Sequence, residues 1–190
     1  MLSLRDARPS DVSLLKIMIH EFAAFERLPV AVTEARLARD GFGQRPKFRA
    51  LIAEWDAQPA GYALFFDYYS SFHGRPGLFV EDVYVRAQFR GNGIGKALFA
   101  RVAEIAREED CFGLRWEVLD WNIPAIEFYR KLGATFLDDW RNVNLEGEAL
   151  QRLASKRRIC CFLLKNNQKQ IPRSARDDIF GALFPQPDEL

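Results

Sequence analysis

The apolar positions of the chain follow two periods that alternate along its first 154 residues. Residues 2–6 alternate apolar and polar side chains, which predicts a strand. After Pro9-Ser10-Asp11 the apolar spacing changes to three and four, which predicts a helix with one apolar face. That face carries Leu14, Leu15, Met18, Ile19, Phe22 and Phe25. A second, shorter helix is expected from a cap at Thr33 to Gly41.

Strands are expected in the next stretch. Residues 48–55 and 60–69 are rich in aromatic and aliphatic side chains, and the intervening Asp56-Ala57-Gln58-Pro59 predicts a hairpin between them. A third strand is expected over residues 78–85.

A crossover unit follows these strands. A glycine-rich turn leads into a predicted helix over 95–109 and a strand over 113–119, and this order favours a parallel strand pair. Asn122 is placed to cap a further helix with Pro124 in its first turn, and Gly133 is placed to end it. The remaining expected elements are a strand pair and a short helix, over residues 135–137, 141–145 and 148–154.

Composition indicates one folded domain with a basic tail. The 190 residues are 48% hydrophobic and 13% aromatic, which is enough apolar surface for a core. The net charge of +1 gives no general electrostatic reason to bind nucleic acid or an anionic membrane. Residues 155–190 hold 7 Lys+Arg against 4 Asp+Glu. We expect them to form a tail, disordered or loosely docked, that follows a domain over 1–154.

Neither a metal site nor a membrane segment is expected. Three cysteines and two histidines cannot supply paired ligands at zinc-site spacing. The N-terminus lacks the apolar stretch of a secretory signal, and no uncharged run approaches the roughly 18 residues that span a bilayer. The expected compartment is the cytoplasm.

The candidate chemistry centres on the segment Gln88-Phe89-Arg90-Gly91-Asn92-Gly93-Ile94-Gly95-Lys96, between an apolar strand and an amphipathic helix. Backbone N–H groups and a helix N-terminus favour an anion there, and phosphate is the natural candidate. A Walker A loop does not fit, because Ala97 follows Lys96 and the upstream glycines are too close. The dinucleotide fingerprint does not fit either, because it requires glycine or alanine where Lys96 stands. The glycines alone leave open a tight turn that binds nothing.

The pattern Gln88-x-x-Gly91-x-Gly93 resembles the pyrophosphate loop of the GCN5-related N-acetyltransferases (GNAT), and the elements over residues 2–150 follow that family's order. The resemblance implies the GNAT fold, an α+β architecture in which helices flank a mixed, mostly antiparallel sheet with a splayed parallel strand pair. Four segments are similar to the diamine acetyltransferases that act on spermidine and spermine, and to the thialysine acetyltransferases. They are Glu21–Glu26, Asp40–Gly43, Val80–Val85 and Asp120–Tyr129.

The resemblance also implies acetyl-CoA as cosubstrate, with the pantetheine arm along the third strand and the pyrophosphate in the glycine-rich loop. The expected contacts are Val83, Tyr84, Val85, Arg90, Gly91, Asn92, Gly93, Ile94, Gly95, Lys96, Asn122, Ile123, Pro124 and Ala125. Arg90 is nearly as compatible with an exposed loop arginine that contacts no phosphate. A backbone N–H near Val83 is expected to hold the oxyanion.

Two side chains are expected to carry the chemistry. Tyr129 matches the family tyrosine that protonates the departing thiolate, although packing in the core is the ordinary role of a tyrosine so placed. Glu81 matches the family glutamate that binds the substrate, and a carboxylate there suits removal of a proton from the ammonium. Because neighbouring strand residues face opposite ways, only one of Glu81 and Asp82 is expected to reach the site directly. The full set of expected acceptor contacts is Phe25, Glu26, Glu81, Asp82, Asp138 and Asp139.

The resulting hypothesis is an acetyl-CoA-dependent N-acetyltransferase, expected to be a homodimer without a metal. It transfers the acetyl group directly, in a ternary complex, to a primary amine of a small polyamine, diamine or lysine-like molecule. Two alternatives stay open at this point. In the first alternative, the acceptor is a protein N-terminus or a lysine side chain. In the second, the chain is a coenzyme A-binding module without turnover.

Overall fold

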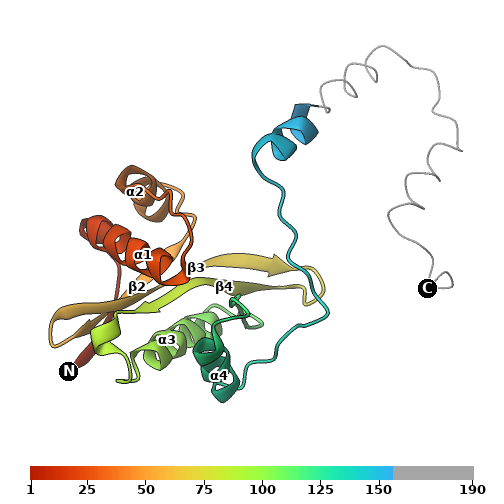
Figure 1. Cartoon of the computed structure of the whole chain (residues 1–190). Coiled ribbons are helices and arrows are strands. Elements are labelled where there is room, and N and C mark those ends of the chain that lie inside the picture. The colour runs from red at the N-terminus through yellow and green to blue at the C-terminus, as the bar shows by residue number, and fades with distance from the viewer. Residues whose placement is uncertain (156–190) are drawn as a thin grey trace, which may run out of the picture. The chain divides into compact units, whose positions relative to one another are not determined.

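Five strands form one sheet in the order β1-β2-β3-β4-β5 in the computed structural model, which describes residues 1–155 (Figure 1). The strands are β1 (Leu2–Asp6), β2 (Arg49–Trp55), β3 (Gln58–Ser70), β4 (Arg75–Val85) and β5 (Leu114–Arg115). Neighbouring strands from β1 to β4 are antiparallel, whereas β4 and β5 run parallel. The predicted mixed, mostly antiparallel sheet is confirmed.

Helices cover both faces of this sheet (Figure 1). The pair α1 (Val12–Glu26) and α2 (Glu34–Phe42) covers one face, and α3 (Ile94–Glu108) and α4 (Ile123–Lys131) cover the other. Short 3-10 turns, η1 (Pro9–Asp11) and η2 (Ala87–Phe89), precede α1 and α3. Each face of the sheet has its own hydrophobic core. Successive residues of β2 belong to different cores, since Leu51 packs under α3 and Ile52 packs under α1. Both sides of the central strands are therefore apolar.

Capping side chains lie where the sequence places them. Thr33 Oγ1 accepts a hydrogen bond from the Arg36 N–H at 3.3 Å, and Asn122 Oδ1 accepts one from the Ala125 N–H at 3.3 Å. Gly133 has a left-handed φ of 85° directly after α4.

The β2–β3 turn is tighter than expected. Asp56 and Ala57 both have positive φ, 49° and 62°, as a two-residue hairpin turn requires. Gln58 therefore already pairs with Trp55, and β3 begins two residues before the expected start at 60.

A charged cluster joins β1, β2 and the start of α1. The Arg5 guanidinium donates to both oxygens of Asp11, at 2.7 and 2.9 Å, and to Glu54 Oε1 at 2.8 Å. Asp11 is 8% exposed and also accepts from the Arg8 N–H at 2.7 Å. The Arg5 hydrogen bonds lower the pKa of Asp11, so this carboxyl is ionised in the folded protein.

The strand predictions at the C-terminal side hold only in part. The strand expected over 113–119 forms as β5 but is shorter, since only Leu114 and Arg115 pair with β4. The expected strands over 135–137 and 141–145 do not form in the described chain. The two segments pair neither with each other nor with the sheet, and Val143 is 92% exposed.

The chain divides into two compact units, Met1–Gly133 and a second that begins at Ala134. In the second unit a helix runs over residues 147–155, where one is expected, with an ion pair between Arg152 and Glu148 at 3.2 Å. The expected domain boundary at 154 stays a prediction, and the predicted tail lies, from residue 156 on, outside the described residues. Within residues 1–155, none of the helices combines the length and apolar character that crossing a membrane requires.

Candidate active site

The glycine-rich loop makes its turn with two left-handed residues. Gly91 has a φ of 82° and Gly93 a φ of 76°, a region that costs other residues about 1–2 kcal/mol. Open space surrounds the position of a Cβ atom at both, so the backbone conformation selects glycine here and crowding does not. Asn92 Nδ2 donates to the Phe89 carbonyl at 3.1 Å and holds the turn closed.

The start of α3 presents backbone donors beside this loop. The Gly93 carbonyl accepts from the Ala97 N–H at 3.0 Å, which is the first bond of the helix. The N–H groups of Ile94, Gly95 and Lys96 therefore have no partner within the helix. Together with the helix dipole they make this end of α3 suitable for an anion such as a pyrophosphate.

The edge of β4 that faces β5 is open beyond Phe79. Pairing between the two strands consists of Leu78 with Leu114 and Phe79 with Arg115. In the described chain no strand pairs with Val80–Val85 on this side. An extended ligand arm can therefore add to β4 as a strand does, next to the glycine-rich loop.

Tyr84, in the middle of this edge, directs its ring away from it. The ring is buried under α1, with ring centroids 5.6 Å from Phe22 and 6.2 Å from Tyr62. A ligand arm along β4 therefore meets the backbone of Tyr84 and not its phenol.

A β-bulge sits at Glu81. Leu64 pairs with Asp82 and Phe65 pairs with Val80, so Glu81 has no opposite residue on β3. A bulge interrupts strict alternation, which was the basis for expecting that only one of the two neighbouring carboxyls reaches the site. The charge of Glu81, the preceding residue, contributes to a raised pKa at Asp82.

Glu26, at the C-terminal end of α1, connects the groups around this edge. Its charge contributes to raised pKa values at Tyr62, Asp82 and Tyr129, which belong to β3, β4 and α4. The side chain is half-buried, and that burial raises its own pKa. Three elements thus bring acidic and phenolic groups within electrostatic reach of Glu26 on α1.

The carboxyls of this site hold protons more tightly than free carboxyls. Burial raises the pKa of Asp82 to about 6, against a hydrogen bond from Tyr62 that lowers it, while Glu81 and Glu26 add repulsion. The pKa of Glu81 is raised mainly by partial burial and, to a smaller extent, by the negative charge of Glu117. The causes of the raised pKa values at Glu26, Glu81 and Asp82 include no cation.

Tyr129 lies on α4 with its ring held on several sides. Its ring centroid is 5.5 Å from that of Phe99 and 5.2 Å from that of Trp116. Its hydroxyl makes no hydrogen bond to residues 1–155, and that part of the chain has no buried side-chain polar atom without a partner. The hydroxyl is therefore accessible. Burial raises the pKa of Tyr129 to about 12, so the phenol keeps its proton at neutral pH.

Arg90 lies over aromatic rings. Its guanidinium carbon is 4.8 Å from the ring centroid of Phe25 and 6.0 Å from that of Tyr84, and its Nε donates to the Val85 carbonyl at 2.9 Å. Phe25 also meets Trp121, with ring centroids 6.1 Å apart. The end of α1 thereby contacts both the glycine-rich loop and the segment that leads into α4.

The sequence of this site and its fold agree with one family. The model of the acetyltransferase (GNAT) family matches residues 14–134, which span the loop, the open edge of β4 and Tyr129. The chain belongs to the GNAT family. It is an acetyltransferase, as its relatives over most of its length also are.

Several curated relatives of this acetyltransferase cover most of its chain. The thialysine N-epsilon-acetyltransferases of Sus scrofa and Mus musculus are 38% and 40% identical over 166 residues, which are 80% of this chain and 97% of each relative. The L-ornithine N5-acetyltransferase of Arabidopsis thaliana is 31% identical and matches 79% of this chain and 86% of its own length.

Solved structures support the fold. An integron cassette protein of V. cholerae superposes with a TM-score of 0.69 at 23% identity and covers 80% of this chain and 97% of its own. The ribosomal-protein-alanine N-acetyltransferase of Brucella melitensis superposes with a TM-score of 0.62 at 20% identity, over 77% of this chain and 100% of its own.

Two side chains beside the candidate site are ones that the sequence alone did not single out. The Tyr62 hydroxyl donates to Asp82 Oδ2 at 2.8 Å. The negative charge of Glu117 contributes to the raised pKa of Glu81. The signal for Tyr62 is the strand register, which places it diagonally opposite Asp82. Asp138 and Asp139 are exposed residues of the second unit, and their role as acceptor contacts stays a prediction.

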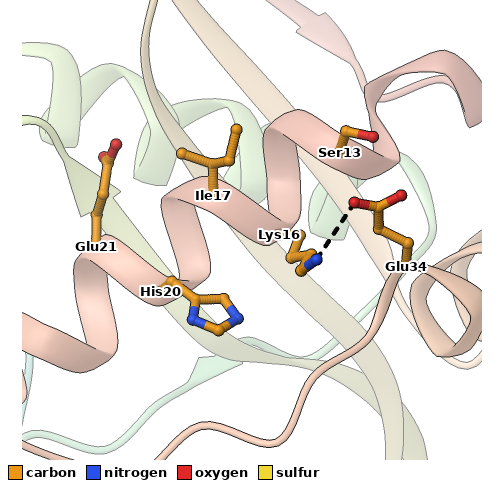
Figure 2. Close-up of a pocket in the computed structure, with 6 residues that line it drawn as sticks. All are labelled: Ser13, Lys16, Ile17, His20, Glu21 and Glu34. Atoms are coloured by element: carbon orange, nitrogen blue, oxygen red, sulfur yellow. Dashed lines mark hydrogen bonds and ion pairs between the residues drawn. The ribbon is translucent and has the colours of Figure 1, made fainter.

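A hollow of about 450 Å³ lies elsewhere on the acetyltransferase, along the outer side of α1 (Figure 2). Its lining residues are Ser13, Lys16, Ile17, His20, Glu21 and Glu34. Figure 2 shows Lys16 directed toward Glu34, with which it forms an ion pair at 3.4 Å. None of the predicted site residues lines the hollow, and Glu21 is held by Arg86 at 2.9 Å. We do not assign the chemistry to it.

The described chain holds no cluster of three or more His, Cys, Asp or Glu side chains arranged to hold a metal ion.

Proposed function

We propose that this acetyltransferase transfers the acetyl group of acetyl-CoA to a primary amine of a small polyamine, diamine or lysine-like molecule, by direct transfer in a ternary complex. The observation that carries the proposal is the pair of carboxyls Glu81 and Asp82 on the open stretch of β4, with Glu26 near enough to affect the pKa of both Asp82 and Tyr129. The thialysine and ornithine acetyltransferases among the relatives support an amine of this size.

The chain offers a suitable place for acetyl-CoA. The free N–H groups at the start of α3 suit its pyrophosphate, and the open stretch Val80–Val85 suits its extended arm. The first turn of α4, which Asn122 caps, is the remaining contact that we propose. The accessible hydroxyl of Tyr129 lies on the same helix, two turns further on.

The acidic character of the site suits a cationic acceptor. A small primary amine with a pKa near that of lysine, about 10.4, arrives as an ammonium ion. Glu26, Glu81 and Asp82 supply negative charge for it. Two or more carboxyls at one site favour an acceptor that carries a second cationic group, as diamines and polyamines do.

The transfer requires three proton movements that these residues can perform. The ammonium gives one proton to a carboxylate, Asp82 or Glu81, directly or through water. The neutral nitrogen then forms a bond to the acetyl carbon as the carbon–sulfur bond breaks. Tyr129 donates its proton toward the sulfur that leaves, and the second proton that the nitrogen loses as the amide forms returns to the Tyr129 oxygen. The products are the amide and the free thiol, with one proton left on the carboxyl. A backbone N–H of β4 near Val83 is our candidate donor to the carbonyl oxygen.

A panel of acceptors tests the proposal. Full-length protein is mixed with acetyl-CoA and, in turn, with spermidine, putrescine, thialysine, lysine, ornithine and a peptide with a free N-terminus, and released thiol and product mass are measured. We expect acetylation of one or more of the small amines. Acetylation of the peptide alone would mean that the acceptor is a protein and not a small amine. Binding of acetyl-CoA without any transfer would mean that the chain is a coenzyme A-binding module without turnover.

The homodimer implied by the family resemblance and the cytoplasmic location expected from the sequence belong to the same proposal. Light scattering of the purified protein is expected to give twice the 21.9 kDa chain mass. Cell fractionation is expected to place the protein in the soluble fraction. A chain-sized particle, or a protein that sediments with membranes, would overturn the respective part.

A further inference from the structure

Tyr62 lies in the core beside the acceptor end of the proposed site, and its side chain is wholly buried, with 0% exposure. The ring packs with Leu15, Met18 and Ile52 in the core under α1. A buried tyrosine normally needs a partner for its hydroxyl. Here the partner is a carboxyl of the site, because Tyr62 donates to Asp82 Oδ2 at 2.8 Å.

The strand register sets this contact. Tyr62 pairs with Tyr84 and Leu64 pairs with Asp82, so Tyr62 and Asp82 are diagonal neighbours across β3 and β4. The bulge at Glu81 lies next to Asp82 and fixes which face of the sheet its carboxyl takes. Because the Tyr62 ring cannot move within a filled core, its hydroxyl is a fixed donor.

We propose that Tyr62 is a positioning residue for acetyl transfer, whose buried hydroxyl holds one oxygen of Asp82 so that the other oxygen faces the acceptor amine. This inference rests on the function proposed above. Asp82 Oδ1 makes no hydrogen bond to residues 1–155, and Asp82 is only half-buried, so this oxygen is the one available to a ligand.

The hydrogen bond from Tyr62 helps to keep the Asp82 carboxyl ionised, because the other groups around Asp82 favour its protonated form. The groups that act on Asp82 are Tyr62 from β3, Glu81 from its own strand and Glu26 from α1, and none of them is a cation. Burial and the two glutamates raise the pKa of Asp82 to about 6, and the Tyr62 hydroxyl is the one group that lowers it. Without that hydroxyl, more of Asp82 would be protonated near neutral pH and could not take a proton from the amine.

The substitution Tyr62→Phe tests the inference, because it removes the hydroxyl and keeps the ring. Loss of one hydrogen bond to a charged group shifts a pKa by about one unit, so we expect the acid limb of the kcat/KM profile to move up by about one pH unit. At pH 6 this corresponds to a loss of about fivefold in kcat/KM, and at pH 8.5 to almost none. Tyr68→Phe, on the same strand and packed on Phe112 outside the site, is the matched control and should leave the profile in place.

A combination with Asp82→Asn separates positioning from general damage. If Tyr62 acts through Asp82, adding Tyr62→Phe to Asp82→Asn lowers kcat/KM no further, within about twofold. An additive loss in the double variant would overturn the inference. So would a loss for Tyr62→Phe that is equal at every pH, because that is the behaviour of a side chain with only a packing role.

Direct titration of the carboxyl adds a measurement that does not depend on turnover. Carboxyl carbon NMR of full-length protein labelled at aspartate should show a higher pKa for Asp82 in Tyr62→Phe than in the wild type, and an unchanged Asp82 titration would overturn the inference. Acetyl-CoA binding and thermal unfolding confirm that the variant is folded. If no amine of the panel is acetylated by wild type, the proposed function fails and the positioning role with it. If transfer occurs and the acid limb stays in place, only the positioning role fails.

Discussion

Replacing Tyr129 by phenylalanine isolates the hydroxyl that is proposed to assist the departing sulfur. The ring contacts with Phe99 and Trp116 are kept in the variant, and the hydroxyl makes no hydrogen bond to the described residues. We therefore expect a change in unfolding free energy within about 0.5 kcal/mol. Acetyl-CoA affinity should also stay the same, because the loop and the open edge of β4 are untouched.

The expected loss of turnover follows from acid strengths. A positioned general acid contributes about 10²- to 10⁴-fold. With a pKa of about 12, Tyr129 is a weaker acid than a thiol, whose pKa is about 8.5. It can stabilise the thiolate by a hydrogen bond, but complete proton transfer to it is uphill. We therefore expect the lower end of that range, about 100-fold in kcat, which equals about 2.7 kcal/mol of transition-state stabilisation.

The assay is release of free thiol from acetyl-CoA with a saturating small amine, at several pH values below 9. Tyr68→Phe, whose ring lies against Phe112, serves as the control and should keep full activity. A Tyr129→Phe enzyme with unchanged kcat and intact acetyl-CoA binding would remove Tyr129 as the acid. A variant that loses acetyl-CoA binding as well would assign the residue to the binding of the cosubstrate.

Three further substitutions test other parts of the account. Gly93→Ala should cost about 1 kcal/mol of stability from its positive φ and raise the KM for acetyl-CoA, whereas Gly74→Ala, at φ 62° in the β3–β4 turn, should cost as much and leave KM unchanged. An equal KM for both variants would contradict a phosphate role of the loop. Glu26→Gln should raise the KM for the amine several-fold and leave that for acetyl-CoA in place, and an unchanged amine KM would exclude Glu26 from the acceptor site. Asp11→Asn should lower the unfolding free energy by about 2 kcal/mol at pH 7, because it weakens the bidentate bond from Arg5. Since the pKa of Asp11 is lowered in the folded state, its contribution to stability is complete above a pH of about 4 and is lost as the pH falls below that value. The unfolding free energies of wild type and variant should therefore converge in acid. A difference that stays constant with pH would refute this.

Local sequence signals were sufficient for most of the fold. The change of apolar period from two to 3.6 located β1 and α1, and the side-chain caps Thr33 and Asn122 located the starts of α2 and α4. These features depend on residues close together in the chain. The strand pair expected over 135–137 and 141–145 does not form, because short apolar segments do not by themselves determine whether they pair.

The site was predictable only where a motif marks it. The loop glycines follow from the left-handed φ that the turn requires, and Tyr129 follows from the family resemblance. The bulge at Glu81 and the bond from Tyr62 to Asp82 both arise from the register between β3 and β4, which pattern and period leave undetermined. The effect of the Glu26 charge on Asp82 and Tyr129 likewise depends on how the helices pack on the sheet, which the sequence does not reveal.

Initial rates with acetyl-CoA and a small primary amine varied together test the central claim most directly. Transfer to an amine in a ternary complex predicts intersecting double-reciprocal lines, with one mole of acetylated amine formed for each mole of thiol released. Parallel lines would indicate an acetylated enzyme intermediate and contradict direct transfer. Thiol release without acetylated amine, at the same rate whether or not the amine is present, would contradict the proposed function itself.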